Sequence, residues 1–119
     1  MYKISIQSGY VQVERPDDFK IIMEELDAFH SDMAAACKES GYNKVLILGE
    51  KVEVKLSFTE IFKVGEAIAK LDLKIAVVED HDAPRDHTKF LEDVTVNRGS
   101  QIRFFNNASD AKDWLGVSP

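Results

Sequence analysis

Cysteine is almost missing from this chain of 119 residues. Because Cys37 is the only cysteine, one chain can form neither an intrachain disulfide nor a multi-cysteine metal site. This usage is typical of a reducing compartment, so we predict a cytoplasmic protein. Proline is also scarce, with three residues, and no repeat, linker or low-complexity tract divides the chain. The length suits one domain over residues 1–119.

Basic residues are in the minority. Fifteen Lys and Arg stand against twenty-one Asp and Glu, which gives a net charge of −6. An acidic surface repels phosphate backbones and anionic lipid head groups, so we expect no nucleic-acid partner. No apolar run is long enough to cross a bilayer, and the first residues alternate instead of forming a secretion signal. We therefore expect no membrane span.

Short apolar stretches supply the predicted strands. Residues 2–6 and 10–14 alternate polar and apolar side chains around Ser8-Gly9, which predicts a β-hairpin. The runs 45–48 and 74–78 are almost wholly apolar and rich in β-branched residues, as in central strands covered on both faces. Residues 101–105 form a last predicted strand.

The first predicted helix begins at Pro16 and ends at Gly41, because proline presets a helical angle and glycine suits a left-handed cap. At about 24 residues and 1.5 Å per residue it would be about 36 Å long and would overhang a small sheet. Its apolar stripe recurs at spacings of three and four: Phe19, Ile22, Met23, Leu26, Phe29, Met33 and Cys37.

The second predicted helix begins at Ser57, where Glu60 completes the pattern of a capping box. Its expected buried stripe is Phe58, Ile61, Phe62, Gly65, Ile68 and Ala69. A third helix is predicted from Pro84 to Gly99, and a short final helix follows Asn106-Asn107. In the final helix Trp114 is expected to anchor the carboxyl terminus.

These elements follow the order ββαβαβαβα. Strands that alternate with helices after an opening hairpin predict an α/β domain, in which helices pack against a mixed five-stranded sheet with a parallel centre.

The later part of the sequence resembles the SpoIIAA-like family of bacterial domains. The resemblance is carried by Phe90-Leu91-Glu92-Asp93, Val96-Asn97-Arg98-Gly99, Ile102-Arg103-Phe104-Phe105, Ala111 and Trp114-Leu115. It implies a fold similar to the STAS domains of anti-sigma-factor antagonists and to the CRAL-TRIO lipid-binding domains. The function that it implies is binding or regulation.

The sequence departs from the antagonists at their phosphorylation site. Those proteins carry Asp-Ser-Ser-Gly at a helix start, whereas this chain has Lys55-Leu56-Ser57-Phe58. Phosphorylation of Ser57 is physically reasonable, because a helix amino terminus stabilises negative charge. The capping box already accounts for the serine and is the preferred interpretation.

The densest polar cluster follows the strand 74–78 and contains Asp80, His81, Asp82 and His87. Ligands in open α/β sheets bind beyond the carboxyl ends of the strands, and these side chains would suit a metal or acid–base chemistry there. The spacing of the histidines matches no familiar metal motif, and a solvated loop is the preferred interpretation. No recognised catalytic or phosphate-binding motif occurs, so we predict no cofactor and favour a protein that is not an enzyme.

A second candidate site is apolar. It would be lined by aromatic, methionine and isoleucine side chains of the first two helices: Phe19, Met23, Phe29, Met33, Phe58, Ile61 and Phe62. Core packing is the simpler interpretation, but a pocket for a small apolar or lipid-like ligand is our leading functional hypothesis. The alternatives are a protein-interaction module of a signalling system and a small enzyme or metal-binding protein that uses residues 79–87. The overhang of the first helix also suggests a homodimer.

Overall fold

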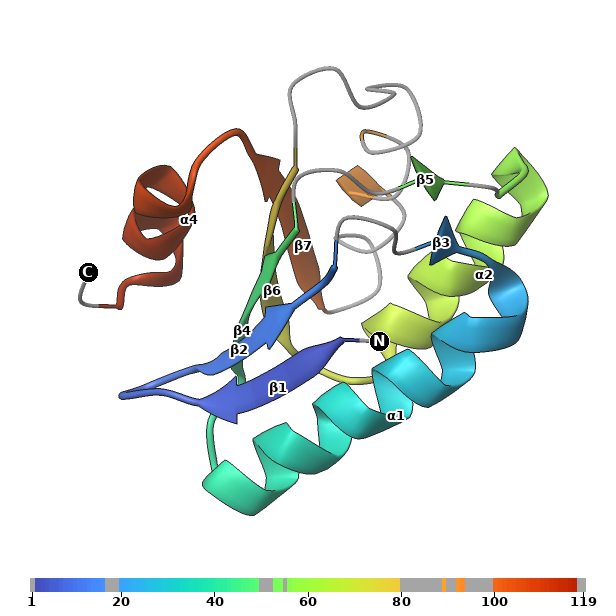
Figure 1. Cartoon of the computed structure of the whole chain (residues 1–119). Helices are drawn as coiled ribbons and strands as arrows, with labels where there is room; N and C mark the ends of the chain where they lie inside the picture. The colour runs from blue at the N-terminus through green and yellow to red at the C-terminus, as the bar shows by residue number, and fades with distance from the viewer. Residues whose placement is uncertain are drawn as a thin grey trace.

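The main sheet forms where the sequence places its apolar runs. The computed structural model describes residues 2–16, 20–49, 53–54, 56–79, 89, 92–93 and 100–117. Five strands lie in the order β1-β2-β4-β6-β7 (Figure 1). Their bounds are Lys3–Ile6 for β1, Val11–Glu14 for β2, Lys44–Leu48 for β4, Lys74–Val78 for β6 and Gln101–Phe105 for β7. Only β1 is antiparallel to its neighbour, which confirms the predicted mixed sheet with a parallel centre.

The start of the first helix was predicted wrongly. Helix α1 spans Met23–Ser40, and the short strand β3, Lys20–Ile21, precedes it. This strand pairs in parallel with β5, Glu53–Val54, in a separate two-stranded sheet. The pairing partner lies far along the chain, so no local signal revealed it. At 18 residues α1 is about 27 Å long, which is shorter than the ~36 Å from which an overhang was expected.

Helix α2 begins where the capping box predicted. It spans Phe58–Ala69. The Glu60 amide donates to Ser57 Oγ at 3.2 Å, and the Ser57 amide donates to Glu60 Oε1 at 3.0 Å. The expected burial of Phe58 and Phe62 was wrong, because they are 51% and 38% exposed. The buried stripe contains Ile61, Val64, Gly65, Ile68 and Ala69, and the two phenylalanines lie on its flank.

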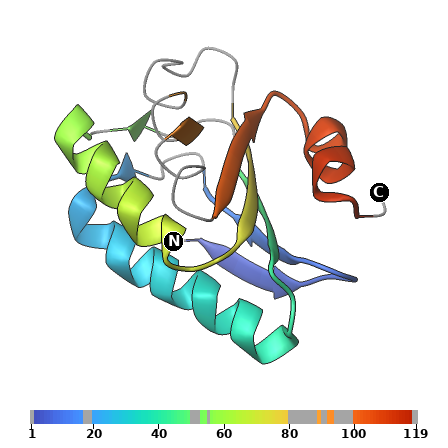
Figure 2. The same cartoon turned by 180° about the vertical axis from the view of Figure 1, so that it is seen from behind.

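Among the fully described helices, α1 and α2 cover one face of the sheet and α4, Ala108–Leu115, covers the other (Figures 1 and 2). Helices α1 and α2 pack on the face formed by Val11, Val13, Val45, Ile47, Ile75, Val77 and Ile102. Helix α4 packs on the opposite face against Leu46, Ala76 and Val78. The alternation of side chains along each strand divides the apolar core into these two layers.

Helix α4 begins at the predicted asparagine cap, where Asn107 Oδ1 accepts from the Asp110 amide at 2.8 Å. Its docking depends on Leu115 more than on Trp114. Leu115 is fully buried, whereas Trp114 is partly exposed and lies under Lys74 Nζ, 4.6 Å from the ring centroid. The same Nζ donates to the Trp114 carbonyl at 2.7 Å.

We expect Leu115→Ala to lower the free energy of unfolding by about 3 kcal/mol, because it leaves a cavity under the helix. Trp114→Ala should cost less than this, because part of the tryptophan side chain already faces water. Urea denaturation of both variants measures the two losses. A larger loss for Trp114→Ala would show that the tryptophan is the anchor.

A buried hydroxyl joins the start of β7 to the end of α2. Ser100 donates to the carbonyls of Ile68 and Ala69 at 2.9 and 3.1 Å, and it accepts from the Leu73 amide at 3.1 Å. These bonds satisfy carbonyls that the helix end leaves without an intrahelical partner. Ser100 therefore fixes α2 against the sheet on the same face as α1.

The predicted third helix falls largely outside the described residues. Lys89 and the pair Glu92–Asp93 are helical within it, while Pro84, Phe90, Leu91, Val94 and Gly99 are not described.

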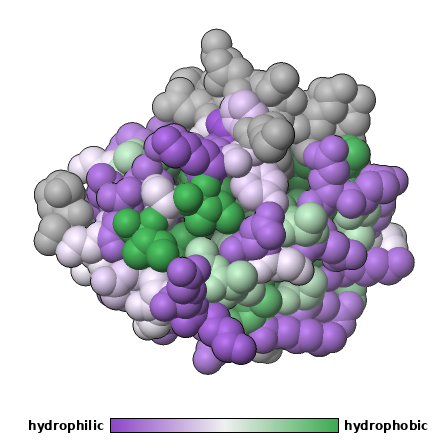
Figure 3. All heavy atoms as spheres, turned by 60° about the horizontal axis from the view of Figure 1, so that its bottom comes forward, coloured by the Kyte–Doolittle hydropathy of each residue, from purple (hydrophilic) through white to green (hydrophobic). Residues whose placement is uncertain are grey.

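Among the residues that are described, no helix has the length and hydropathy to cross a membrane. Figure 3 views the molecule from the side on which α1 lies, and some hydrophobic residues adjoin there in a patch that hydrophilic residues border.

Candidate functional site

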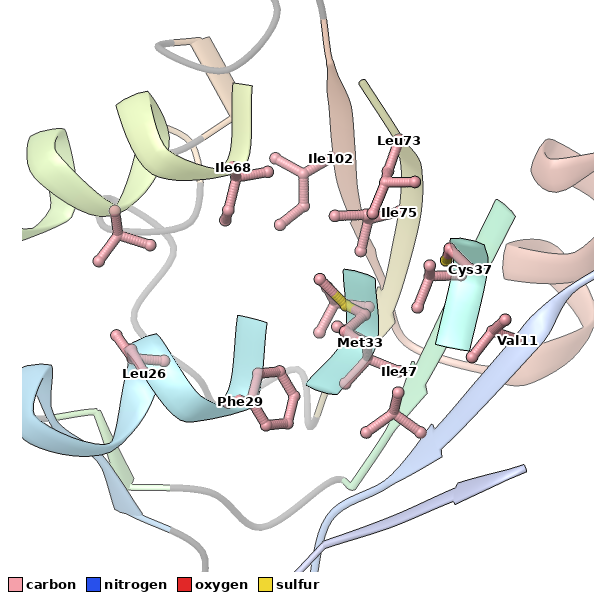
Figure 4. Packing of buried hydrophobic residues seen from close by; sticks show 14 residues of the cluster. Val11, Leu26, Phe29, Met33, Cys37, Ile47, Ile68, Leu73, Ile75 and Ile102 are labelled. Atoms are coloured by element: carbon pink, nitrogen blue, oxygen red, sulfur yellow. The ribbon is translucent and has the colours of Figure 1, made fainter. Parts of the chain in front are cut away.

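A pocket lies between α1, α2 and the sheet. Its volume is about 100 Å³. Helix α1 contributes Leu26, Phe29 and Met33, helix α2 contributes Ile61, Val64 and Ile68, and the sheet contributes Ile47, Ile75 and Ile102. In Figure 4 the side chains of Met33, Ile68 and Ile102 point into the space between the helices and the sheet. The wall is almost entirely apolar, which is the usual character of a small-molecule site.

A buried ion pair forms the polar end of this pocket. Arg15 follows β2 and Glu79 follows β6, and β4 lies between these two strands. The Arg15 side chain therefore crosses the carboxyl end of β4 to reach Glu79, with 3.6 Å between Nη1 and Oε1. Arg15 and Glu79 are only 8% and 5% exposed. Both charges are thus withdrawn from water at the sheet edge where α/β domains place their ligands.

Backbone carbonyls hold the guanidinium of Arg15. Its Nε donates to the Leu48 carbonyl at 3.2 Å, and its Nη2 donates to the carbonyls of Gly49 and Val78 at 3.0 and 3.4 Å. The Arg15 amide also donates to the Leu48 carbonyl at 2.9 Å, which extends the β2–β4 ladder by one residue. The position of this charge is therefore fixed by the ends of β4 and β6.

Glycine is required where β4 meets Arg15. Gly49 has a φ of +130°, a conformation that side chains with a β-carbon rarely adopt. A β-carbon at this position would lie 2.7 Å from Arg15 Cβ and 2.9 Å from the Arg15 carbonyl oxygen. The missing side chain of Gly49 is what lets Arg15 cross the end of the strand.

The carboxyl of Glu79 is only partly satisfied. Its Oε2 is buried and has no hydrogen-bond partner among the residues that the structure describes. Burial raises the pKa of Glu79 above its ordinary value, although the positive charge of Arg15 opposes the shift. A buried oxygen without a donor is costly, so a hydrogen-bond donor that reached this atom would stabilise the pocket wall.

This raised pKa predicts a pH dependence of stability. The folded state binds the Glu79 proton more tightly than the unfolded chain does. The stabilisation from that proton is therefore full below the unfolded pKa of about 4.5 and is lost as pH rises through the folded pKa. The free energy of unfolding of the wild type, minus that of Glu79→Gln, should fall as pH rises from 4. A difference that stays constant with pH would show that Glu79 is not perturbed.

Two further groups in this layer can titrate. His30 lies on the pocket wall, and burial lowers its pKa, against the charge of Asp27, so its ring is neutral at pH 7. Burial raises the pKa of the Cys37 thiol, which belongs to the buried stripe of α1. Cys37 is therefore a buried apolar group with little thiolate, as the sequence suggested.

The apolar residues proposed from the sequence separate into three groups. Phe29, Met33 and Ile61 line the pocket, and Met23 packs at the edge of the same core without lining it. Phe58 and Phe62 lie on the exposed flank of α2. Phe19 lies outside the described residues.

The polar loop proposed from the sequence lies outside the described part of the chain. Asp80, His81, Asp82 and His87 all belong to residues 80–88, which the structure does not describe. Within the described ranges, no three His, Cys, Asp or Glu side chains come together in a way that would hold a metal ion. Ser57 is described and exposed, and its hydroxyl forms the helix cap. Its phosphorylation stays a prediction.

Sequence reasoning missed the role of Arg15 and gave Glu79 only as part of a polar loop. One signal was available, since each charged residue directly follows an apolar strand and Gly49 follows the strand between them. The order of the strands, which brings them together, was not available. An arginine and a glutamate this far apart in the sequence pair only through the fold.

An α/β domain with an apolar pocket at its sheet edge is the class that this geometry defines. No protein-family model matches the sequence, and no curated protein matches it. The structure is similar to the crystal structure of an uncharacterised protein of the DUF3478 family, with a SpoIIAA-like fold, from Shewanella loihica PV-4. The TM-score is 0.56 at 16% identity, and the match covers 97% of this chain and 92% of that one. The chain therefore has a SpoIIAA-like fold, which confirms the fold implied by the sequence resemblance.

Proposed function

We propose that this protein is a non-enzymatic binding domain that holds a small, mainly apolar molecule in the pocket between α1, α2 and the sheet. The observation that carries the proposal is a pocket of about 100 Å³ whose described wall residues are apolar except for Arg15, His30 and Glu79. A core would ordinarily fill such a space, because protein interiors contain few voids larger than a water molecule.

The volume limits the size of the ligand. An engineered apolar cavity of about 150 Å³ in another protein binds benzene. The space of about 100 Å³ is smaller than this cavity, so it suits at most one small ring or a short branched chain. A long acyl chain would have to extend out of the pocket, so the ligand that we propose is smaller than the lipids suggested by the family resemblance.

Native mass spectrometry of the freshly purified protein tests this function. We expect a retained mass that is lost on denaturation. A melting temperature that rises with added toluene is the second expected result, because a ligand of the folded state stabilises it by mass action. Phe62→Ser is the matched control, since it removes an exposed aromatic ring outside the pocket and should leave the toluene effect unchanged. A clean mass together with no toluene effect would contradict the proposal.

A homodimer is the second candidate, and the exposed pair Phe58 and Phe62 favours it. The two rings are one helical turn apart on α2 and present an apolar surface. Sedimentation velocity over a range of concentrations, with the wild type and with Phe58→Ser/Phe62→Ser, tests this interface. A dimer that the double variant abolishes would support it, and a monomer at all concentrations would remove it.

The cytoplasm is the compartment that we propose for this activity. The single thiol, Cys37, is buried and unpaired, and a reducing compartment keeps it so.

A further inference from the structure

We infer that the ligand of the pocket is a neutral molecule with one hydroxyl group, which donates a hydrogen bond to Oε2 of Glu79. The inference rests on the proposed function and specifies the chemistry of the ligand's polar end. The observation behind it is a buried acceptor oxygen that has no donor among the described residues and that belongs to Glu79, a residue of the pocket wall.

The charges on the wall explain why the ligand is neutral. Among the described residues that line the pocket, Arg15 and Glu79 carry opposite charges 3.6 Å apart, and His30 is neutral at pH 7. An anionic ligand would meet Glu79, and a cationic ligand would meet Arg15. Neither charge would be fully compensated in a pocket whose described wall is otherwise apolar.

The hydrogen-bonding capacity of the pair explains why the group is a hydroxyl. Glu79 Oε2 requires a donor. A guanidinium has five N–H groups, and three of those on Arg15 are donated to backbone carbonyls. Its Nη1 faces Glu79 and retains donor capacity. A hydroxyl donates through its hydrogen and accepts through its oxygen, so one such group satisfies both partners.

The test compares phenol and toluene, which are nearly equal in size, with benzoate, which carries a carboxylate. Phenol differs from toluene in its hydroxyl, and benzoate is an anion. Affinities at pH 7 are measured by NMR titration of the full-length protein. We expect phenol to bind about 10-fold to 100-fold more tightly than toluene, because a hydrogen bond to a charged group is worth that factor. Benzoate should bind more weakly than phenol.

The variant Glu79→Leu should remove the preference for phenol while toluene still binds. It should also improve benzoate binding, because it leaves the positive charge of Arg15 without its counter-ion. If Glu79→Leu does not fold, Glu79→Gln preserves the size of the side chain and should reduce the preference, since the hydrogen bond is no longer assisted by charge. The exposed variant Phe62→Ser should behave as the wild type.

The possible outcomes separate this inference from the proposed function. Equal binding of toluene and phenol to the wild type would overturn the hydroxyl inference and leave the apolar pocket in place. Benzoate binding more tightly than phenol would also overturn it. Failure of all three probes to bind would overturn the inference together with the proposed function.

Discussion

Replacing Arg15 with methionine should lower the free energy of unfolding at pH 7 by about 3 to 5 kcal/mol, because the change leaves Glu79 charged and buried without its partner. Arg15 is 8% exposed and Glu79 is 5% exposed, so water cannot replace the lost charge. Urea denaturation monitored by circular dichroism measures the loss. The loss should shrink as pH falls toward 4.5, because the buried Glu79 takes up its proton above its ordinary pKa of 4.5.

The double variant Arg15→Met/Glu79→Leu is the control for this prediction. It removes both charges and should recover about 2 kcal/mol of the loss, because no buried carboxylate remains without a partner. Full recovery is not expected, since the carbonyls of Gly49 and Val78 still lose the donor Nη2. A double variant as unstable as Arg15→Met would contradict the role assigned to the ion pair.

Gly49→Ala should lower the free energy of unfolding by about 2 to 5 kcal/mol. Part of this cost is backbone strain, because the φ of +130° lies in a region that is nearly restricted to glycine. The other part is the contact of the new methyl group with Arg15 Cβ and with the Arg15 carbonyl, at 2.7 and 2.9 Å. Because the pocket end of Arg15 must then shift, the variant should also lose affinity for phenol.

Gly41→Ala is the matched comparison for this variant. Gly41 also has a positive φ, of +80°, but a β-carbon there would have no atom within 4 Å. Gly41→Ala should therefore lower the free energy of unfolding by about 1 kcal/mol, which is the cost of backbone strain alone. Equal losses at the two positions would mean that the close approach to Arg15 contributes nothing.

The sequence contained enough information for the central sheet, because each strand carries its own signal. The runs 45–48 and 74–78 are apolar on both faces, and the hairpin alternates, so local composition determined these elements. The capping box located the start of α2 within the chain for the same reason. The strand β3 carried no such signal. Its two residues form a strand only by pairing with β5, and Pro16 led us to expect a helix there.

The candidate site was predictable only in its apolar half. The helical stripes gave Phe29, Met33 and Ile61, because helical periodicity predicts which side chains face the sheet. Periodicity also placed Phe58 and Phe62 inward, but both side chains are exposed. The apolar stripe at the end of a helix can extend past the edge of the elements on which the helix packs. The polar half depends on the order of the strands, which brings Arg15 across β4 to Glu79.

The fold leaves the activity open. The similar crystal structure is that of an uncharacterised protein, and at 16% identity the likeness concerns the path of the chain. The residues of this pocket are therefore what favours binding. Its apolar wall, the orphaned Oε2 of Glu79 and the fixed guanidinium of Arg15 are features of this sequence.

The most direct test of the central claim is an isotope-filtered NOE experiment on the labelled protein with added toluene. We predict contacts between the ring protons of toluene and the methyl groups of Met33, Ile61 and Ile102, which line the pocket. Contacts restricted to exposed side chains such as Phe58, or no contacts at all at a saturating concentration, would contradict the claim that this pocket binds a small apolar molecule.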